Sequence, residues 1–440
     1  MERIEDFLRQ NALLHAERRA IVTPNSAVTY AELFDKVQAK AVALADKRGQ
    51  AVVFRSSPTI DFLVTYFAIH VAGAVAVPME KDATDQQLRQ MEQELEGLKL
   101  PSDVADILFT TGTTGHPKGV MISHKAILAN ADNLVAAQGY THELVFVISG
   151  PLNHLGSLSK VYPTVQCGAT LYLLEGMKDL NAFYAAFDYP CRKMATFLVP
   201  ASIRMLLMFS SERLKAISHK IDFIETGAAP MAHGDMKELC QLLPDSRLYN
   251  TYASTETGII STYNYNDGIC VGGCLGLPLR HSRFMLTDDG RVACQGDTLM
   301  SGYVGNEALT NELLRDGTFL TADLGHVDEL GRLYLQGRAD DLINVGGLKV
   351  APIEVENAAL SMEGIADCLC VPASHPMMGT VLKLLVVPQK HRSFDMKQLA
   401  AYLREHLERY KVPMLYEQVE RIHKTFNGKP DRKRYGRAVD

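Results

Sequence analysis

Tryptophan is absent from this 440-residue sequence, and no long run of charges of one sign occurs in it. The formal net charge is only -6, with 45 basic against 51 acidic residues. A protein that coats nucleic acid needs clusters of Lys and Arg, so this composition argues against a nucleic-acid partner. The N-terminal stretch MERIEDFLRQ carries charges where a signal peptide needs an apolar segment. The sequence therefore predicts no export and a cytoplasmic location.

Paired cysteines at C-x-x-C spacing are also lacking, which argues against a structural zinc site or thioredoxin-like redox chemistry built on that motif. The eight cysteines stand at positions 167, 191, 240, 270, 274, 294, 368 and 370. Free cysteine is among the residues most often buried. We therefore expect them to be reduced, mostly buried small residues.

One apolar segment, residues 62–79, runs for eighteen residues without a charged side chain, which is the lower limit for a membrane crossing. The helix-start and helix-end signals in and before this segment favour a helix followed by a strand instead. Ser57 and Pro58 are typical of a helix N-cap and a first-turn proline, and Gly73 is typical of a helix end. Residues 74–78 then predict a short buried strand, so no membrane span is expected.

The first 280 residues alternate between helical patterns and short apolar runs. Thr29 and Glu32 form a capping box ahead of an apolar helical stripe. Apolar runs at 169–175, 194–200 and 220–227 are typical of buried strands. This alternation predicts an α/β architecture.

After Arg291 the segments shorten and turn signals become frequent. The chain exceeds the length at which one core stops growing, so at least two domains are expected. The predicted elements are hairpins at Asp289-Gly290, Asp316-Gly317 and Leu330-Gly331, strands at 365–371 and 381–387, and a helix from Asp395 to Tyr410. The last hundred residues thus predict a small α+β domain.

The strongest local signal is Phe109 to Gly119, FTTGTTGHPKG, which follows an apolar run and precedes a helix expected near Ser123. Glycines allow close approach to phosphate oxygens, threonine hydroxyls add donors, and Lys118 adds positive charge. The segment is not a Walker A motif, because no Ser or Thr follows the lysine. A flexible Gly/Thr loop is the alternative interpretation.

This segment resembles the phosphate loop of the adenylate-forming superfamily, which contains acyl- and aryl-CoA synthetases, luciferase-like enzymes and the adenylation domains of peptide synthetases. Five sequence motifs of this superfamily, including the phosphate loop, occur in the expected order, so the resemblance extends from about residue 20 to residue 435. It implies that the phosphates of ATP are bound by Thr110, Thr111, Gly112, Thr113, Thr114, Gly115 and Lys118.

The second motif is Asn250 to Glu256, NTYASTE. The resemblance implies that Asn250 reads the adenine amino group and that Tyr252 lies against the ring. Thr255 would meet the α-phosphate and Glu256 would hold Mg²⁺, a hard cation that prefers carboxylate oxygen. A Thr-Glu pair taken alone is more often a solvated turn.

The third and fourth motifs are FLTADL and the segment that begins at Gly337. Asp323 would bind the ribose hydroxyls, although Ala322 replaces the family's usual glycine. Arg338 would meet the nucleotide, and Asp340 would be the hinge between the two domains. A surface ion-pair cluster is the alternative for Arg338 and its acidic neighbours.

The remaining motifs concern the thiol and the adenylation step. Gly346 and Gly347 would let backbone pass close to a thiol arm, and Lys349 holds a basic position. Lys429, about ninety residues after the hinge, would bridge the acid's carboxylate and the α-phosphate. A basic tail without a ligand is the alternative.

His154 bears on the choice of acid substrate. It lies in a segment that resembles the one lining the boundary between the acid and thiol tunnels in CoA synthetases. Amino-acid-activating relatives carry an aspartate near this position, and none occurs here. An acid without an α-amino group is therefore favoured. Its pocket is expected to be lined by residues 153–157, 197–201, 227–230 and 257–258.

The resemblance as a whole implies a large multi-subdomain α/β domain over residues 1–339 and a small mobile α+β domain over 340–440. The expected activity is ATP- and Mg²⁺-dependent formation of an acyl-AMP and transfer of the acyl group to coenzyme A. A carrier-protein phosphopantetheine thiol, a non-catalytic nucleotide-binding role and luciferase-like oxidation remain alternatives. About thirty residues separate Pro78 from the phosphate loop, fewer than in relatives, which questions the usual subdomain layout.

Overall fold

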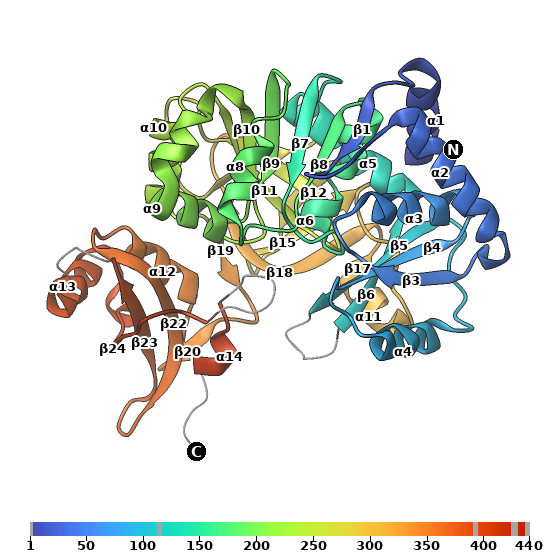
Figure 1. The fold of residues 1–440 in the computed structure, drawn as a ribbon. Helices are drawn as coiled ribbons and strands as arrows, with labels where there is room; N and C mark the ends of the chain where they lie inside the picture. Colours follow the sequence, from blue (N-terminus) through green and yellow to red (C-terminus); the bar gives the residue numbers. More distant parts are fainter. Residues whose placement is uncertain (1–2, 112–116, 390–394, 424–429, 436–440) are drawn as a thin grey trace.

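The computed structural model of this protein describes residues 3–111, 117–389, 395–423 and 430–435. A large N-terminal unit is followed by a small unit that extends away from it (Figure 1). The predicted α/β fold class, with a small α+β unit at the C-terminal end, is confirmed. The position of the boundary at residue 339/340 and the hinge role of Asp340 stay predictions.

A five-stranded sheet lies near the N-terminus of the large unit, in the order β16-β6-β5-β4-β3. Its strands are β3 (Ala51–Arg55), β4 (Val75–Met79), β5 (Val104–Thr111), β6 (Pro117–Ser123) and β16 (Gly302–Tyr303). The nearby helices are α1 (Ile4–Leu14), α2 (Tyr30–Ala43), α3 (Ile60–Val71), α4 (Asp85–Leu95) and α11 (Glu307–Leu313). Helix α4 connects the parallel neighbours β4 and β5, so the shortened segment after Pro78 still completes this sheet.

The predicted phosphate loop connects β5 to β6, which pair antiparallel. Strand β6 leads directly into α5 (His124–Gln138), where Ser123 accepts the Ala126 N–H as N-cap at 3.1 Å. The sheet therefore fixes both ends of that loop.

The second sheet joins fourteen strands, and its central strands β11-β10-β9-β7-β8-β1 are parallel. Their bounds are β1 (Arg19–Val22), β7 (Leu144–Ile148), β8 (Thr170–Leu173), β9 (Lys193–Phe197), β10 (Ile221–Thr226) and β11 (Arg247–Ser254), with β2 (Ala27–Thr29) at the edge. Alternate residues of β7 enter two different cores: Phe146 packs in one and Val147 in the other. Burial on both faces explains the continuous apolar runs in the sequence.

Helices cover this sheet on both faces (Figure 1). They are α5 together with α6 (Leu155–Leu158), α7 (Val161–Gln166), α8 (Leu180–Ala186), α9 (Pro200–Ala216) and α10 (His233–Leu242). Short 3₁₀ turns occur at η1 (Ala45–Lys47), η2 (Ser218–Lys220) and η3 (Arg409–Lys411).

Antiparallel strands extend the second sheet and contain the three predicted hairpin turns. The strands are β12 (Gly258–Asn264), β13 (Cys274–Pro278), β14 (Ser282–Leu286), β15 (Arg291–Gly296), β17 (Leu314–Arg315), β18 (Thr318–Val327) and β19 (Leu333–Arg338). Asp289-Gly290, Asp316-Gly317 and Leu330-Gly331 connect neighbouring strands in antiparallel pairs, as expected.

The small unit has its own apolar core under a sheet in the order β22-β23-β24. It comprises β20 (Ile343–Val345), β21 (Leu348–Val350), α12 (Pro352–Leu360), β22 (Ile365–His375), β23 (Gly379–Pro388), α13 (Met396–His406), β24 (Leu415–Gln418) and α14 (Arg432–Tyr435). Gly346 and Gly347, with φ of 58° and 93°, form the turn between β20 and β21.

Two element boundaries differ from the sequence prediction. Helix α3 is capped by Thr59, whose hydroxyl accepts the Phe62 N–H at 3.2 Å, not by Ser57 with Pro58 in the first turn. Helix α13 ends at His406 rather than Tyr410, because Leu407 becomes extended and packs against the small core. In both cases a local side-chain or packing contact decided the boundary.

The apolar segment 62–79 forms most of α3 and strand β4, as predicted. Among the described residues, no helix has both the length and the apolar character needed to cross a membrane. The eight cysteines are all free, and Cys274, Cys294, Cys368 and Cys370 are buried.

Candidate active site

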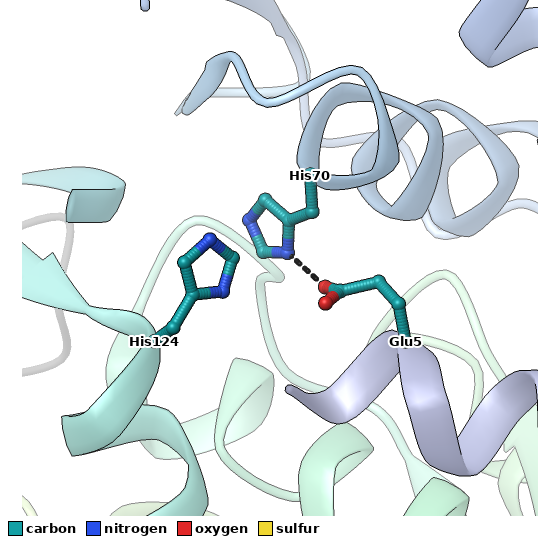
Figure 2. Close-up of side chains that lie close together, drawn as sticks. All are labelled: Glu5, His70 and His124. Carbon is teal, nitrogen blue, oxygen red and sulfur yellow. Dashed lines mark hydrogen bonds and ion pairs between the residues drawn. The ribbon is translucent and has the colours of Figure 1, made fainter. Parts of the chain in front are cut away.

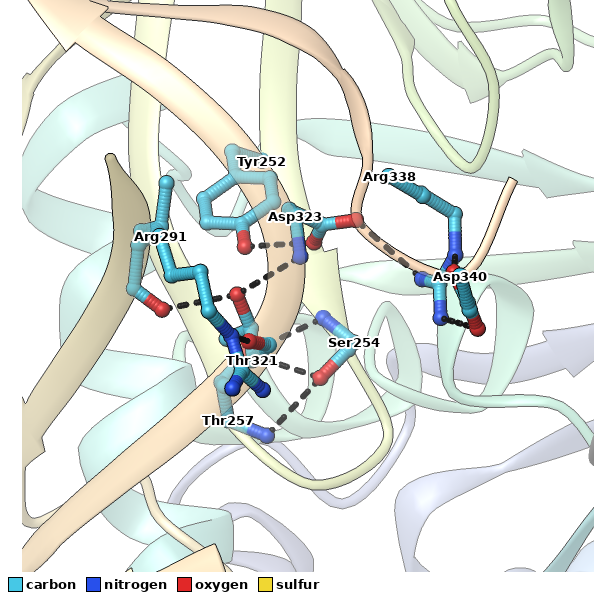
Figure 3. Close-up of polar contacts among 9 residues, drawn as sticks. Tyr252, Ser254, Thr257, Arg291, Thr321, Asp323, Arg338 and Asp340 are labelled. Carbon is cyan, nitrogen blue, oxygen red and sulfur yellow. Dashed lines mark hydrogen bonds and ion pairs between the residues drawn. The ribbon is translucent and has the colours of Figure 1, made fainter. Parts of the chain in front are cut away.

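The turn between β11 and β12 carries Thr255 and Glu256. Ser254 and Thr257 close this turn, because each backbone N–H donates to the other residue's hydroxyl at 3.1 Å. The two hydroxyls also lie 3.0 Å apart (Figure 3). These bonds hold the turn in one conformation, and thereby fix the backbone that carries the two predicted catalytic residues.

Three residues predicted from separate motifs are linked by side-chain contacts across three strands. The Tyr252 hydroxyl on β11 donates to Asp323 Oδ2 on β18 at 2.7 Å. Asp323 Oδ1 accepts from the Arg338 guanidinium on β19 at 3.1 Å, and Asp323 and Arg338 are register partners. Figure 3 shows this chain of contacts continuing to Asp340.

Arg338 binds Asp340 through two parallel bonds, Nε to Oδ1 and Nη2 to Oδ2, at 3.0 and 3.1 Å. Burial alone would lower the pKa of Arg338, but the carboxylates of Asp340 and Asp323 outweigh it and raise the pKa. The guanidinium is therefore a fixed positive charge between the predicted ribose ligand and the predicted hinge. The surface ion-pair alternative covers both contacts, because the contact between Arg338 and Asp323 is also an ion pair, and the nucleotide role of Arg338 stays a prediction.

Tyr252 is 5% exposed, and burial followed by the charge of Asp323 raises the pKa of its phenol well above the usual value. It thus remains a hydrogen-bond donor at neutral pH. Asn250 lies two residues earlier on β11 and is buried. Its amide Nδ2 donates to the Cys274 carbonyl at 2.9 Å, so in this conformation one of its donor groups already has a protein partner.

Glu256 and Lys118 meet at the same aromatic side chain. The Tyr303 hydroxyl donates to Glu256 Oε1 at 3.2 Å, and Lys118 Nζ lies 5.6 Å from the centre of the Tyr303 ring. Tyr303 belongs to β16, which pairs with β6. One tyrosine thus brings the predicted metal ligand next to the lysine of the phosphate loop.

The residues around Glu256 fit a magnesium ion that is bound together with a polyphosphate. Mg²⁺ is typically held by one or two carboxylates plus substrate phosphates and water, rather than by an all-protein cage. Glu256 supplies one carboxylate, and no group of three metal-ligating side chains surrounds it in the described part of the chain. Glu256 would hold the ion, and the ion would neutralise charge on the phosphates.

Part of the phosphate loop and the catalytic lysine lie outside the described residues: Gly112, Thr113, Thr114, Gly115 and Lys429. Before the loop, the Thr110 hydroxyl donates to the Lys118 carbonyl at 3.5 Å across the β5–β6 pair, while the Thr111 side chain also lies outside the described part. After Lys429, Arg432 binds the buried Glu356 on α12 at 2.5 and 2.8 Å. The predicted roles of these residues stay predictions.

His154 immediately precedes α6, and its Nε2 lies 3.5 Å from Glu80 Oε1, just after β4. Burial would raise the pKa of Glu80, but hydrogen bonds from His154 and Asn153 lower it. The neighbouring Asn153 is buried and accepts a hydrogen bond from Ser56 at 3.2 Å. His154 is thus held at the junction of the two sheets.

Three of the four segments predicted to line the acid pocket meet at the Phe197 ring. A Cβ added to Gly156 would lie 3.1 Å from that ring, and one added to Gly227 would lie 3.7 Å from it and 2.9 Å from a backbone oxygen of Thr251. Close packing against backbone therefore requires glycine at 227, whereas a side chain at 156 would need the Phe197 ring to shift by a few tenths of an ångström.

A buried ion pair beside Phe197 escaped the sequence analysis. Lys160 and Glu225 form a salt bridge of 2.7 Å with side chains 2% and 1% exposed, and Lys160 Nζ lies 5.2 Å from the Phe197 ring centre. Burial lowers the pKa of Lys160, against the opposing effect of Glu225. The only sequence signal was a lysine within an apolar stretch.

Backbone strain marks a further loop. Ala228, in the predicted pocket segment after β10, has φ of 66°, a left-handed conformation that is uncommon for residues with a Cβ. Such strain clusters at functional sites. Nothing in the residue type indicated it.

Known proteins resemble this chain over most of its length. Two family models match the chain: AMP-binding enzyme at residues 8–96 and 90–304, and AMP-binding enzyme C-terminal domain at residues 354–429. A Mycobacterium tuberculosis CoA ligase that acts on a propanoyl-substituted methyl-dioxo-octahydroindene is 29% identical over 75% of this chain and 65% of its own length. A 2-succinylbenzoate–CoA ligase from a Geobacillus species is 25% identical over 93% of this chain and 92% of its own. The crystal structure of ATP-bound MatB from Rhodopseudomonas palustris superposes with a TM-score of 0.87 at 23% identity, covering 99% of both chains.

Proposed function

The chain belongs to the family of AMP-binding enzymes and is an ATP-dependent acid–CoA ligase, and we propose that it joins a carboxylic acid without an α-amino group to coenzyme A through an acyl-AMP. The observation that carries the proposal is the chain of contacts from Tyr252 through Asp323 and Arg338 to Asp340. It connects residues assigned separately to adenine, ribose and the hinge. A carrier-protein thiol remains the alternative acceptor.

In the first half-reaction the acid's carboxylate attacks the α-phosphorus of ATP, and pyrophosphate leaves. The protein's task is to position two anions and neutralise their charge. Lys118 and Glu256, which meet at Tyr303, would act on the phosphates, Glu256 by holding Mg²⁺. Lys429 would then offset the charge shared between the attacking and leaving oxygens.

In the second half-reaction a thiol attacks the acyl-AMP carbonyl and AMP leaves. The resemblance implies that the small unit turns about Asp340, so that Lys429 leaves and the Gly346-Gly347 turn approaches. Both glycines are open, since a Cβ at either would meet nothing within 4 Å. Because Asp340 is bonded twice to Arg338, a rotation there must keep or exchange those bonds.

The acid's side chain is suggested by the surroundings of Phe197. An aromatic ring packed against glycine backbone offers a flat apolar wall, which suits an acyl group with a planar or apolar part. No aspartate that could bind an α-ammonium occurs near His154 in the sequence. Aryl and medium-chain acids are therefore the first candidates, and a small dicarboxylic acid is the alternative.

The test is a panel of carboxylic acids assayed for pyrophosphate release with and without coenzyme A, with α-amino acids as the contrasting set. We expect release with an aryl or apolar acid, and thioester only when coenzyme A is added. Glu256→Gln is the control for metal-dependent turnover. Nucleotide binding without turnover for any acid would favour a non-catalytic role, and thioester formation only on a carrier protein would replace coenzyme A as the acceptor.

A further inference from the structure

A second polar cluster, which we call the buried histidine cluster, consists of Glu5, His70, His124 and Asp106. Glu5 lies in the first turn of α1, His70 in the last turn of α3, and His124 at the start of α5. The exposed fractions of the four residues are 8%, 0%, 4% and 0%. Figure 2 shows Glu5, His70 and His124 pointing towards one another from three different helices.

Asp106 on β5 holds His70 in one orientation. His70 Nε2 lies 2.9 Å from Asp106 Oδ1, while the other carboxylate oxygen accepts from the hydroxyls of Tyr66 and Tyr162 at 2.8 and 3.2 Å. A carboxylate bound to the outer nitrogen of a histidine fixes its tautomer and directs the other nitrogen to a metal. In this cluster, that other nitrogen is Nδ1, and it faces Glu5 at 2.6 Å.

Two buried polar atoms of the cluster have no hydrogen-bond partner within the described chain: His124 Nδ1 and Glu5 Oε2. A buried polar group without a hydrogen-bond partner destabilises a fold, because the group has lost its contact with water. Both atoms belong to residues whose ligand atoms lie close to a ring nitrogen of His70, and this combination is the observation that points to a ligand.

The donor set matches that of a metal centre. One ligand atom each from Glu5, His70 and His124 lies within 4.8 Å of the others. Tetrahedral zinc at about 2.0–2.2 Å from each ligand requires separations of roughly 3.4 Å between ligand atoms, so small side-chain shifts suffice. Two imidazoles and one carboxylate, with an open fourth position, are typical ligands of zinc rather than of Mg²⁺ or Ca²⁺.

Charge and access agree with the geometry. When His70 donates to both carboxylates and His124 is neutral, the four residues of the cluster have a net charge of minus one, and the positive charge of Arg3 lies beside them. A divalent ion would displace the Nδ1 proton of His70 to solvent and bring the net charge to zero. A cavity of about 230 Å³ is lined by Glu5 and His70 together with Arg3, Arg9 and Gln38, so the cluster borders an open space.

We propose that Glu5, His70 and His124 bind one divalent transition-metal ion of the zinc type, which ties α1, α3 and α5 together. Because His124 follows β6 and Asp106 lies on β5, the ion would stabilise the base of the hairpin that carries the phosphate loop. This site is distinct from the magnesium ligand Glu256 of the proposed reaction.

The experiment uses purified full-length protein, freed of metal with a chelator and then titrated with Zn²⁺, and in parallel with Co²⁺ as a spectroscopic probe. We expect about one equivalent of zinc per chain and, for cobalt, the intense visible bands of a tetrahedral site. The melting temperature should rise by about 3 °C at saturating zinc.

Matched variants locate the ion. His124→Leu removes a ligand atom that has no other partner, so the fold should survive while the stoichiometric ion and the thermal shift are lost. Should that variant misfold, Glu5→Gln keeps the shape and removes the charge. His281→Leu is the control, because His281 also faces two carboxylates, those of Asp132 and Asp297 at 3.4 and 3.7 Å, but no second histidine.

The outcomes separate the possibilities. Loss of the ion in His124→Leu or Glu5→Gln, with retention in His281→Leu and Glu256→Gln, supports the site. Absence of stoichiometric zinc in the wild-type protein shows that the cluster is a buried ion network only. Loss in Glu256→Gln instead places the ion at the proposed reaction centre, and it overturns the inference without affecting the proposed ligase activity.

Discussion

The candidate active site and the buried histidine cluster are both polar and charged, but their residues come together differently. In the active site Tyr252 and Glu256 lie in one seven-residue motif, and Asp323 and Arg338 are neighbours across a hairpin. In the buried cluster, Glu5, His70 and His124 lie on three helices and are more than fifty residues apart in the sequence at each step. The residues of the active site can be recognised as sequence motifs, whereas the residues of the buried histidine cluster come together only when the chain folds.

The side chains of the active site are also more exposed to solvent than those of the buried histidine cluster. Arg338 has a side chain 41% exposed, and Asp340 34%, so this end of the active site remains open to solvent. His70 and Asp106 are fully buried. Accessible charges can meet a ligand and change partners, whereas buried charges mainly affect stability because unpairing them is costly. Mutations should therefore affect rate in the first region and stability in the second.

The largest effect is expected for Lys429→Ala. The ammonium is needed only while two anions approach, so acyl-AMP formation should fall by about 10²–10³-fold. Thioester formation from presynthesised acyl-AMP should be spared. Pyrophosphate exchange and thioester formation, measured separately, check this. Equal loss of both half-reactions in folded protein would contradict the role assigned to Lys429.

A smaller loss, in the opposite half-reaction, is expected for Asp340→Pro. Proline fixes φ and costs about 3 kcal/mol where it does not fit, which corresponds to roughly hundredfold slower sampling of a second conformation. If the adenylation arrangement is the one held, pyrophosphate exchange should persist while thioester formation falls. Undiminished thioester formation would remove Asp340 from the hinge.

The same substitution in both regions sharpens the contrast. Glu256→Gln keeps shape but removes charge, so turnover at limiting Mg²⁺ should fall about tenfold with little change in melting temperature. Glu5→Gln should instead lower the free energy of unfolding by about 2 kcal/mol, because His70 loses a charged partner. Thermal melts and magnesium titrations distinguish them. Similar destabilisation by both variants would contradict the expectation that mutations affect rate in the active site and stability in the buried histidine cluster.

The smallest effect is expected for Tyr252→Phe. Its hydroxyl donates to Asp323, and loss of one such bond is worth about 1 kcal/mol, or roughly fivefold in the KM for ATP. The folded state should persist, because the ring is retained. An unchanged KM for ATP would show that the phenol does not position Asp323 for the nucleotide.

Much of the fold could be predicted from the sequence because the relevant signals are local. The capping box at Thr29 and Glu32 forms as expected, with bonds of 2.8 and 3.2 Å, and the Asp-Gly pairs at 289–290 and 316–317 form hairpin turns. Boundaries were less predictable. Thr59 replaced Ser57 as the cap of α3, and Leu407 left the α13 helix for the small unit's core, since packing overrides local propensity.

The sequence by itself determined the family motifs and the alternation of helices and strands. Only the tertiary structure decided that Tyr252 would bind Asp323, that Lys160 would be buried against Glu225, and that Glu5, His70 and His124 would meet. The physical reason is the distance along the chain over which each interaction acts. Backbone hydrogen bonding and apolar periodicity act over a few residues and are visible in sequence. The pairing of charges from distant elements depends on how those elements pack, and no local pattern records it.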